Sequence, residues 1–347
     1  MYIVIAILAF ALLIAIHEFG HFIAAKCCGV KVEEYSIGMG PAIWKHRRGE
    51  TLYALRILPI GGYCAMAGED DESDDPRAFC NQNAFRRFII LFAGSAMNFI
   101  LALVLILIMY ANAQAFVTPS IDHFLDGCPY EGKNALMVGD SFYSIDGRRI
   151  LLVTDVQNFL REGDGVYDLV MLRDGEKVEL KDFEFTPSKY DGELKYGVVF
   201  GLTDATFGAK LNYTWNTAME FSRWVWMGLE QMVSGAVKLN EMYGAVGIVD
   251  MMNTAGKEAE TTVMAAENLL YITALIAVNL AVMNLLPIPG LDGGRIFLML
   301  VAGVVELLTH KKLDSKYETY INITGLVLML LLMAVVMYND IARIITR

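Results

Sequence analysis

The stretch IAIHEFGHFIAA, residues 14–25, places two histidines and one glutamate within an otherwise apolar run. The run begins at Tyr2, and a helix of its length crosses a hydrocarbon core of about 30 Å. An ionisable side chain at that depth costs about 3 kcal/mol unless it is paired or functional. The sequence therefore predicts that His17, Glu18 and His21 have a chemical role inside a membrane helix.

The composition is that of an integral membrane protein with a polar insert. Of the 347 residues, 55% are hydrophobic and 19% charged, and the mean hydropathy is +0.43. Residues 111–260 contain 23 acidic and 13 basic side chains and so carry nearly all of the net charge of −11. Such an acidic region argues against nucleic-acid binding, which requires a basic face. The five cysteines form no CxxC pair and predict neither a disulfide framework nor a cysteine zinc site.

Four apolar runs predict four transmembrane helices, at residues 2–25, 88–110, 268–286 and 321–338. The first has no positive segment before it and is expected to be a retained span rather than a signal peptide. Nine Lys and Arg side chains lie within residues 26–87, and Lys311, Lys312 and Lys316 precede the fourth run. By the positive-inside rule these two connections face the cytoplasm, so both termini and the acidic insert are expected outside.

The first connection is expected to contain β structure. Residues 30–40 and 50–66 are rich in β-forming residues and glycine, which predicts short strands with turns. The segment RILPIGGY, residues 56–63, is too apolar for water and suggests a sheet that dips into the membrane.

The insert is expected to divide into a β part and a helical part. Residues 116–187 predict short strands with turns at Asp146-Gly147 and Asp174-Gly175. Residues 208–239 predict one or two helices on the outer membrane surface, because tryptophan favours that interface and this segment holds Trp215, Trp224 and Trp226. The alternative is that these rings pack into the polar domain.

The spacing of the histidines indicates a metal site. His17 and His21 are four residues apart and share one face of a helix, with Glu18 on the same turn. Two imidazoles in this HExxH pattern can bind one zinc ion, and the glutamate can act as general base toward the metal's water. The alternative is a polar contact between helices. A catalytic zinc takes three protein ligands and keeps a fourth position open, so a third ligand is needed.

The best candidate for the third ligand lies in NLAVMNLLPIPGLDGGR, residues 279–295. Its prolines and Gly290 must break the third apolar helix, and Asp292 follows at once. An aspartate on a broken helix at membrane depth is tolerated where it lines a cavity or binds a partner. The alternative is an aspartate in a surface turn. His46, His123 and His310 are poorer candidates because they lie in the connections or in the outer insert.

These two motifs resemble those of the site-2 protease family of intramembrane zinc metalloproteases. HEFGH, residues 17–21, resembles the family's HExxH, and NLLPIPGLDGG, residues 284–294, resembles its NxxPxPxLDG. The match covers most of the chain and is similar to the bacterial branch that cleaves membrane-bound anti-sigma factors. It implies one catalytic Zn²⁺ held by His17, His21 and Asp292, with Glu18 as the base.

Three further stretches support the resemblance. SIGMGPAIW and PIGGYCAMAGED, residues 36–44 and 59–70, are similar to the family's membrane-associated β region. ALMVGDSFYSIDGRRI, residues 135–150, resembles a PDZ domain, and YGAVGIV, residues 243–249, resembles a motif before the third helix. The implied fold is an α-helical polytopic membrane protein with about four transmembrane helices, a membrane-associated β region and one extracytoplasmic α+β PDZ domain. The expected parts are a membrane core in two halves, residues 1–110 and 263–347, a PDZ domain at 116–203 and surface helices at 204–262.

The resemblance also implies substrates and partners. A transmembrane substrate must unwind before cleavage, and an exposed β edge between Gly38 and Gly62 is expected to hold it in an extended form. The expected substrate-binding residues are Asn279, Asn284, Pro287, Pro289, Gly38, Gly40, Gly61 and Gly62. Substrates would be single-span membrane proteins, such as anti-sigma factors or signal-peptide remnants, trimmed first by an upstream site-1-type protease. The PDZ domain would act as a size filter at the bacterial cytoplasmic membrane, with no nucleic-acid partner.

The chain departs from the family pattern at two points. Ser95 stands in AGSAMNF where the family often has proline, and the carboxylate-binding loop of a PDZ domain is not legible. A membrane-tethered PDZ scaffold without catalysis is the main alternative. A transporter with His and Asp along its pathway is disfavoured because no inverted repeat is visible.

Overall fold

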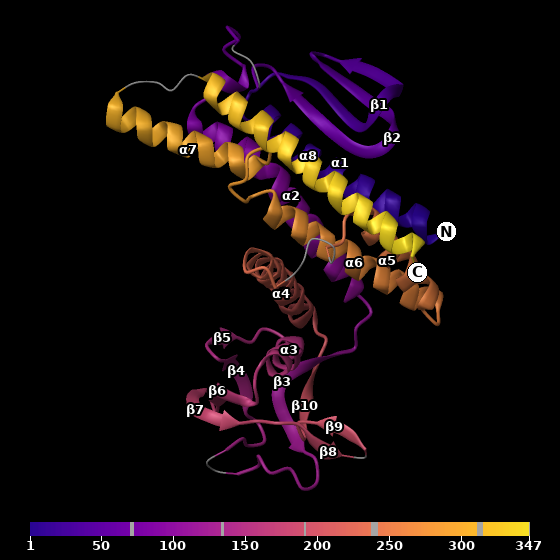
Figure 1. Cartoon of the computed structure of the whole chain (residues 1–347), viewed down its shortest axis with the longest axis vertical. Helices are drawn as coiled ribbons and strands as arrows, with labels where there is room; N and C mark the ends of the chain where they lie inside the picture. The colour runs from indigo at the N-terminus through magenta and orange to yellow at the C-terminus, as the bar shows by residue number, and fades with distance from the viewer. Residues whose placement is uncertain (70–72, 133–134, 191, 237–241, 311–314, 347) are drawn as a thin grey trace. The chain divides into compact units, whose positions relative to one another are not determined.

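The computed structural model describes residues 1–69, 73–132, 135–190, 192–236, 242–310 and 315–346. The chain splits into two compact units, one of residues 1–106 with 221–347 and one of residues 107–220 (Figure 1). Lys311 and Lys312, on which the predicted orientation partly depends, lie outside the described residues.

Four helices have the length and hydropathy to cross a membrane, among the residues that the structure describes. They are α1 (Tyr2–Cys27), α2 (Ala84–Met109), α6 (Thr262–Met283) and α8 (Ser315–Ile345). Large apolar side chains lie on their outer faces, such as Leu8 on α1 and Leu331 on α8, both 59% exposed. Exposed apolar surface on helices of this length is typical of segments that lie in lipid. The four predicted spans are therefore confirmed as membrane-type helices.

A further helix, α7 (Asp292–Thr309), follows the broken end of α6 and was not predicted. Phe297, Leu300, Val304 and Leu307 are exposed on it and recur at helical spacing. Arg295 and Glu306 interrupt this segment, so it contains no apolar run long enough to span a membrane. An apolar stripe of this kind forms a shorter amphipathic helix instead.

The first connection forms a long bent hairpin of β1 (Val32–Arg48) and β2 (Thr51–Met66), which contacts α1. Residues 34–37 pair with residues 62–65 on one side and with 52–55 on the other. The strands can fold back in this way because Gly38, Gly40 and Gly61 adopt φ angles of 86°, 84° and 85°, which L side chains rarely adopt. The expected short strands are thus joined into two long ones that bend at glycines.

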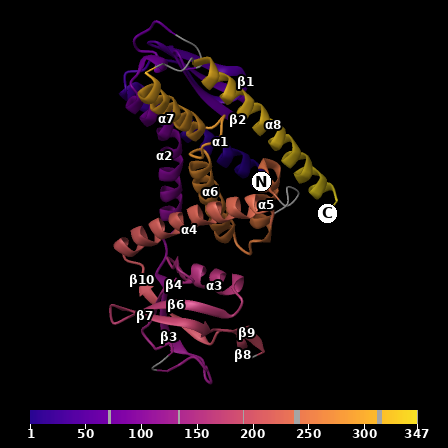
Figure 2. The same ribbon diagram turned by 60° about the vertical axis from the view of Figure 1, so that its left-hand side comes forward.

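The second unit contains a six-stranded sheet and one covering helix. Its strand order is β10-β3-β4-β6-β7, with β5 paired to β4, and helix α3 (Val153–Glu162) packs on this sheet (Figure 2). The strands are β3 (Ala115–Phe124), β4 (Ser141–Ile145), β5 (Arg148–Arg149), β6 (Val166–Arg173), β7 (Glu176–Glu184) and β10 (Val198–Asp204). β8 (Ser188–Tyr190) and β9 (Glu193–Lys195) form a separate pair. The core is apolar and includes Phe142, Ile145, Phe159, Leu169 and Met171.

Both predicted turns of this unit are confirmed. Asp146-Gly147 joins β4 to β5, and Asp174-Gly175 joins β6 to β7. All four residues have positive φ, as the two-residue hairpin loops that match the twist of a sheet require.

Three further helical segments lie outside this sheet, two after it in sequence and one before it. α4 (Phe207–Val233) confirms the predicted helix, and α5 (Ala245–Glu258) and the short η1 (Phe79–Asn81) complete the elements. Trp215 and Trp226 are 52% and 57% exposed, whereas the ring of Trp224 packs on Phe221. Placement of α4 at a membrane surface stays a prediction.

Candidate metal centre

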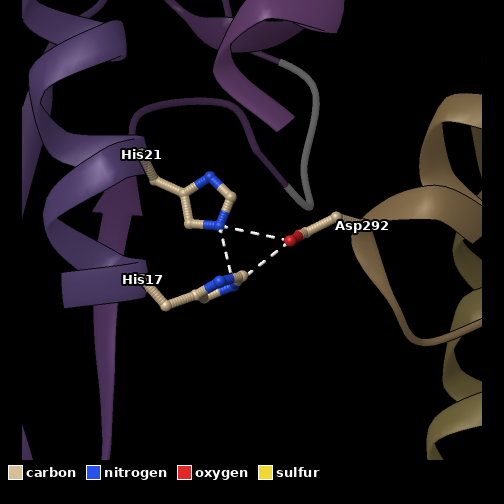
Figure 3. A group of neighbouring side chains, drawn as sticks. All are labelled: His17, His21 and Asp292. Atoms are coloured by element: carbon tan, nitrogen blue, oxygen red, sulfur yellow. Dashed lines mark hydrogen bonds and ion pairs between the residues drawn. The ribbon is translucent and has the colours of Figure 1, made fainter. Parts of the chain in front are cut away.

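The structure brings His17, His21 and Asp292 together, although Asp292 lies 271 residues after His21 (Figure 3). The Nε2 atoms of the two histidines are 3.2 Å apart. Asp292 Oδ2 lies 3.2 Å from His17 Nε2 and 3.4 Å from His21 Nε2. Three ligand atoms from α1 and the first residue of α7 therefore form a nearly equilateral triangle.

This triangle has the dimensions of a zinc site. Zinc bound tetrahedrally at about 2.0–2.1 Å from each ligand atom sets those atoms roughly 3.3–3.4 Å apart. Asp292 Oδ2 is buried, and no hydrogen-bond donor of the described residues satisfies it. A carboxylate and two imidazoles form a donor set suited to zinc. The residues present thus fit a metal ion by distance and by ligand type.

A hydrogen bond orients the His21 ring. His21 Nδ1 lies 2.8 Å from the carbonyl oxygen of Ile90 on α2. A carbonyl accepts only from an N–H, so Nδ1 carries a proton, and the neutral ring, the form that binds a metal, then presents the lone pair of Nε2 toward the triangle. Backbone carbonyls commonly orient metal-binding histidines in this way.

Two residues of α2 belong to this centre and were not singled out from the sequence. Gly94 faces both imidazoles, and a Cβ there would lie 2.7 Å from Cε1 of His17. Asn98 is buried, with Nδ2 3.5 Å from His17 Nδ1 and Oδ1 unpaired among the described residues. If the Asn98 side-chain amide were turned by 180°, its Oδ1 could accept a hydrogen bond from the Nδ1–H of His17. The sequence feature that could have identified Asn98 is its position as a polar residue within the second apolar run.

A compact turn places Asp292. Gly293 N–H donates to the carbonyl of Asn284 at 2.7 Å, closing the loop between α6 and α7. Cβ atoms at Gly293 and Gly294 would overlap the backbone of Leu285 and Ile288. The two glycines after Asp292 are therefore needed for this close approach.

A cavity of about 420 Å³ opens onto the triangle. Its lining includes Glu18, Tyr63, Met66, Glu69 and Asn284, so most of its functional groups are polar. Glu18 is half-buried beside the two histidines, and a Cβ at Gly62 would lie 3.2 Å from its Cγ. The arrangement can hold a water molecule and a peptide next to a metal ion and a carboxylate.

Charged contacts link the segments of the hairpin beside this cavity. Arg56 donates to Glu34 Oε1 at 2.6 Å, to the Gly40 carbonyl at 2.6 Å and to Ser36 Oγ at 2.8 Å. Burial opposes ionisation of Glu34, but hydrogen bonds from Tyr63 and Arg56 outweigh it and lower the pKa of this carboxyl. Glu34 is thus held as a carboxylate that ties three segments of the hairpin together.

The expected substrate-binding residues are not all at the cavity. Asn284 lines it, with Nδ2 3.4 Å from His17 Nε2, whereas Asn279 is exposed on α6 and is not part of the lining. Pro289 lines a second cavity of about 440 Å³, which is apolar and bounded by α8. Pro287 is exposed in the loop before α7, outside both linings. Gly62 packs against Glu18, while the remaining glycines form the bends described above: Gly38, Gly40 and Gly61.

Comparison with known proteins agrees with this geometry. The chain is 35% identical to a protein of Clostridium perfringens over 343 residues, which is 98% of each chain. It is 35% identical to a protein of Clostridium acetobutylicum, covering 98% and 97% of the two chains, and 30% identical to one of Campylobacter jejuni, covering 98% and 93%. All three carry the provisional name zinc metalloprotease. The model of peptidase family M50 matches residues 5–332, and the chain therefore belongs to peptidase family M50.

Proposed function

We propose that the protein is an intramembrane zinc metalloprotease of the site-2 type, which hydrolyses peptide bonds within transmembrane segments. The observation that carries the proposal is the triangle of His17, His21 and Asp292, because its edges match a tetrahedral zinc site and two of its members lie on a membrane-type helix. Family M50 and the names of the relatives give zinc as the metal.

Glu18 is assigned as the general base and acid. When bound by the three side chains, zinc supplies activation of a water molecule for attack on a peptide carbonyl. Glu18 lines the same cavity and accepts the proton of that water. The same carboxyl then delivers a proton to the leaving amine. His21 keeps its ring orientation throughout through its bond to the Ile90 carbonyl.

The open edge of β2 is the proposed binding site for an unwound substrate. A helix hides its carbonyls in intrahelical hydrogen bonds, so the segment to be cut must become extended. Residues 62–65 pair with β1 on one side, and Tyr63, Cys64, Ala65 and Met66 line the metal cavity. An extended segment can add to this edge through its main chain, with the Asn284 amide as a further donor.

The substrates we propose are single-span membrane proteins that an upstream site-1-type protease has already trimmed. Anti-sigma factors and remnant signal peptides have this form. In this scheme residues 116–203 form a PDZ domain that lies extracytoplasmically with both termini and acts as a size filter. The sheet covered by α3 and the two Asp-Gly turns support a PDZ-like fold. Nine basic residues within 26–87 support a cytoplasmic first connection, and thus a metal centre towards the cytoplasmic side.

The test uses the full chain reconstituted in vesicles with a single-span substrate, supplied in trimmed and untrimmed forms. We expect one zinc per chain, cleavage of the trimmed form, and loss of zinc in His17→Ala and in Asp292→Ala. Glu18→Gln should keep zinc and lose cleavage, because it removes only the base. Cleavage by Glu18→Gln contradicts the assigned mechanism. A wild-type protein without metal or cleavage supports the membrane-tethered scaffold instead.

A further inference from the structure

The side chain of Glu69 lines the metal cavity. Glu69 lies three residues after the end of β2, and its Oε2 accepts the backbone N–H of Met66 at 3.3 Å. Its Oε1 accepts from Arg295 of α7, which makes an ion pair between the hairpin and that helix. Arg295 lies three residues after Asp292, so the pair is about one helical turn from the third metal ligand.

The N–H of Met66 belongs to the open edge of β2. The next residue, Ala67, donates its N–H to the Lys31 carbonyl, which lies on the side of β1. Successive N–H groups of an extended chain point in opposite directions, so the N–H of Met66 points away from β1 and toward the cavity. Glu69 therefore occupies the position that a carbonyl oxygen of an added strand would take.

The other end of this edge lies at Glu18, because Gly62 packs against that side chain. Met66 is four residues further along the strand, which corresponds to about 13 Å. The edge between the proposed base and the Glu69 carboxylate therefore has room for an extended segment of roughly four residues.

We propose that the ion pair of Glu69 and Arg295 is an end stop that determines which peptide bond is cut. The proposal rests on the proteolytic function given above. A substrate strand added along the edge meets the Glu69 carboxylate at Met66 and cannot continue its hydrogen-bonding ladder. Arg295 holds that carboxylate from the helix that also bears Asp292, so the stop keeps a constant distance from the metal centre. The length of the extended segment thereby fixes the position of the cut.

The test is the identity of the cleaved bond, mapped by mass spectrometry on the reconstituted full chain and a trimmed single-span substrate. Glu69→Ala frees the N–H of Met66 and should add a product shifted by two residues, because strand registers that keep the same faces differ by two. Glu69→Gln keeps an acceptor for Met66 but loses the ionic bond to Arg295, and should give the same shifted product in smaller amount. Glu50→Ala is the matched control, since Glu50 is a hairpin carboxylate paired with Lys26 and Arg77 outside the cavity lining.

Zinc content measured on the same samples separates the outcomes. If zinc-loaded Glu69→Ala and Glu69→Gln cut only the wild-type bond, the end stop is wrong while the proteolytic function stands. If Glu69→Ala does not fold, the Glu69→Gln product decides alone. If the control Glu50→Ala also gives the shifted product, the end stop is overturned, because any weakening of the hairpin would then move the cut. A wild-type chain that neither binds zinc nor cuts the substrate overturns both proposals.

Discussion

Gly94 offers the most direct test of the metal centre, because a single added methyl group would meet both histidines. A Cβ at this position would lie 2.7 Å from Cε1 of His17 and 2.7 Å from Cε1 of His21. Carbon atoms in favourable contact are about 3.5 Å apart or more, so the rings or α2 must retreat by roughly 0.8 Å. Ligand distances in a zinc site vary by only about 0.2 Å. The required shift is about four times that tolerance.

We therefore expect Gly94→Ala to weaken zinc binding by more than the roughly 10–100-fold that loss of an outer hydrogen-bond partner produces. Alanine favours a helix by about 1 kcal/mol over glycine, so the backbone of α2 itself should not suffer. The measurement is zinc retention in detergent-purified protein titrated with a chelator, with thermal unfolding recorded on the same samples. Gly303→Ala is the control, because a Cβ on this α7 glycine meets no atom within 4 Å. Wild-type zinc retention by a folded Gly94→Ala protein would refute the assigned geometry.

Two other results are expected. Asp340→Ala should lower the free energy of unfolding by about 1–3 kcal/mol without loss of zinc. The reason is that the buried Asp340 carboxylate accepts hydrogen bonds from the N–H groups of Gly244 and Gly247 at the start of α5. An unchanged melting temperature would contradict this expectation. Removal of zinc with 1,10-phenanthroline should abolish cleavage and leave the helical circular dichroism signal unchanged. The helices are stabilised by backbone hydrogen bonds and apolar burial, which do not depend on the metal. A large loss of helical signal would show instead that the metal supports the fold.

Much of the membrane architecture could be predicted from local composition. Each span is a continuous apolar run, and its hydrogen bonds close within the helix, so neither its existence nor its type depends on distant residues. The hairpin turns of the second unit are equally local, since Asp146-Gly147 and Asp174-Gly175 adopt positive φ, which glycine takes without steric cost and which the short polar side chain of aspartate tolerates. Helix α7 was missed because Arg295 and Glu306 leave it no apolar run long enough to span a membrane, although its apolar residues recur with a helical period.

The metal chemistry was also predictable, because HExxH places two imidazoles on one helical face by the 3.6-residue period alone. Asp292 was predicted as a ligand because it follows proline and glycine residues that break a membrane helix. A broken helix with an aspartate at membrane depth is tolerated where it lines a cavity or binds a partner. The same motif gave Glu18 as the base, and the resemblance to the site-2 protease family added Asn279 and Asn284 of the third span. Of those, only Asn284 lines the cavity.

The membrane class, the candidate ligands and the metal chemistry can all be deduced from residue types and short spacings. The packing of the whole chain is what brings His17, His21 and Asp292 into a triangle of zinc dimensions and leaves room for the imidazoles at Gly94. It alone joined Glu69 to Arg295, 226 residues away in sequence. The physical reason is that such contacts result from the packing of α1, α2, α7 and the hairpin together, and no local pattern encodes which surfaces of distant segments will meet.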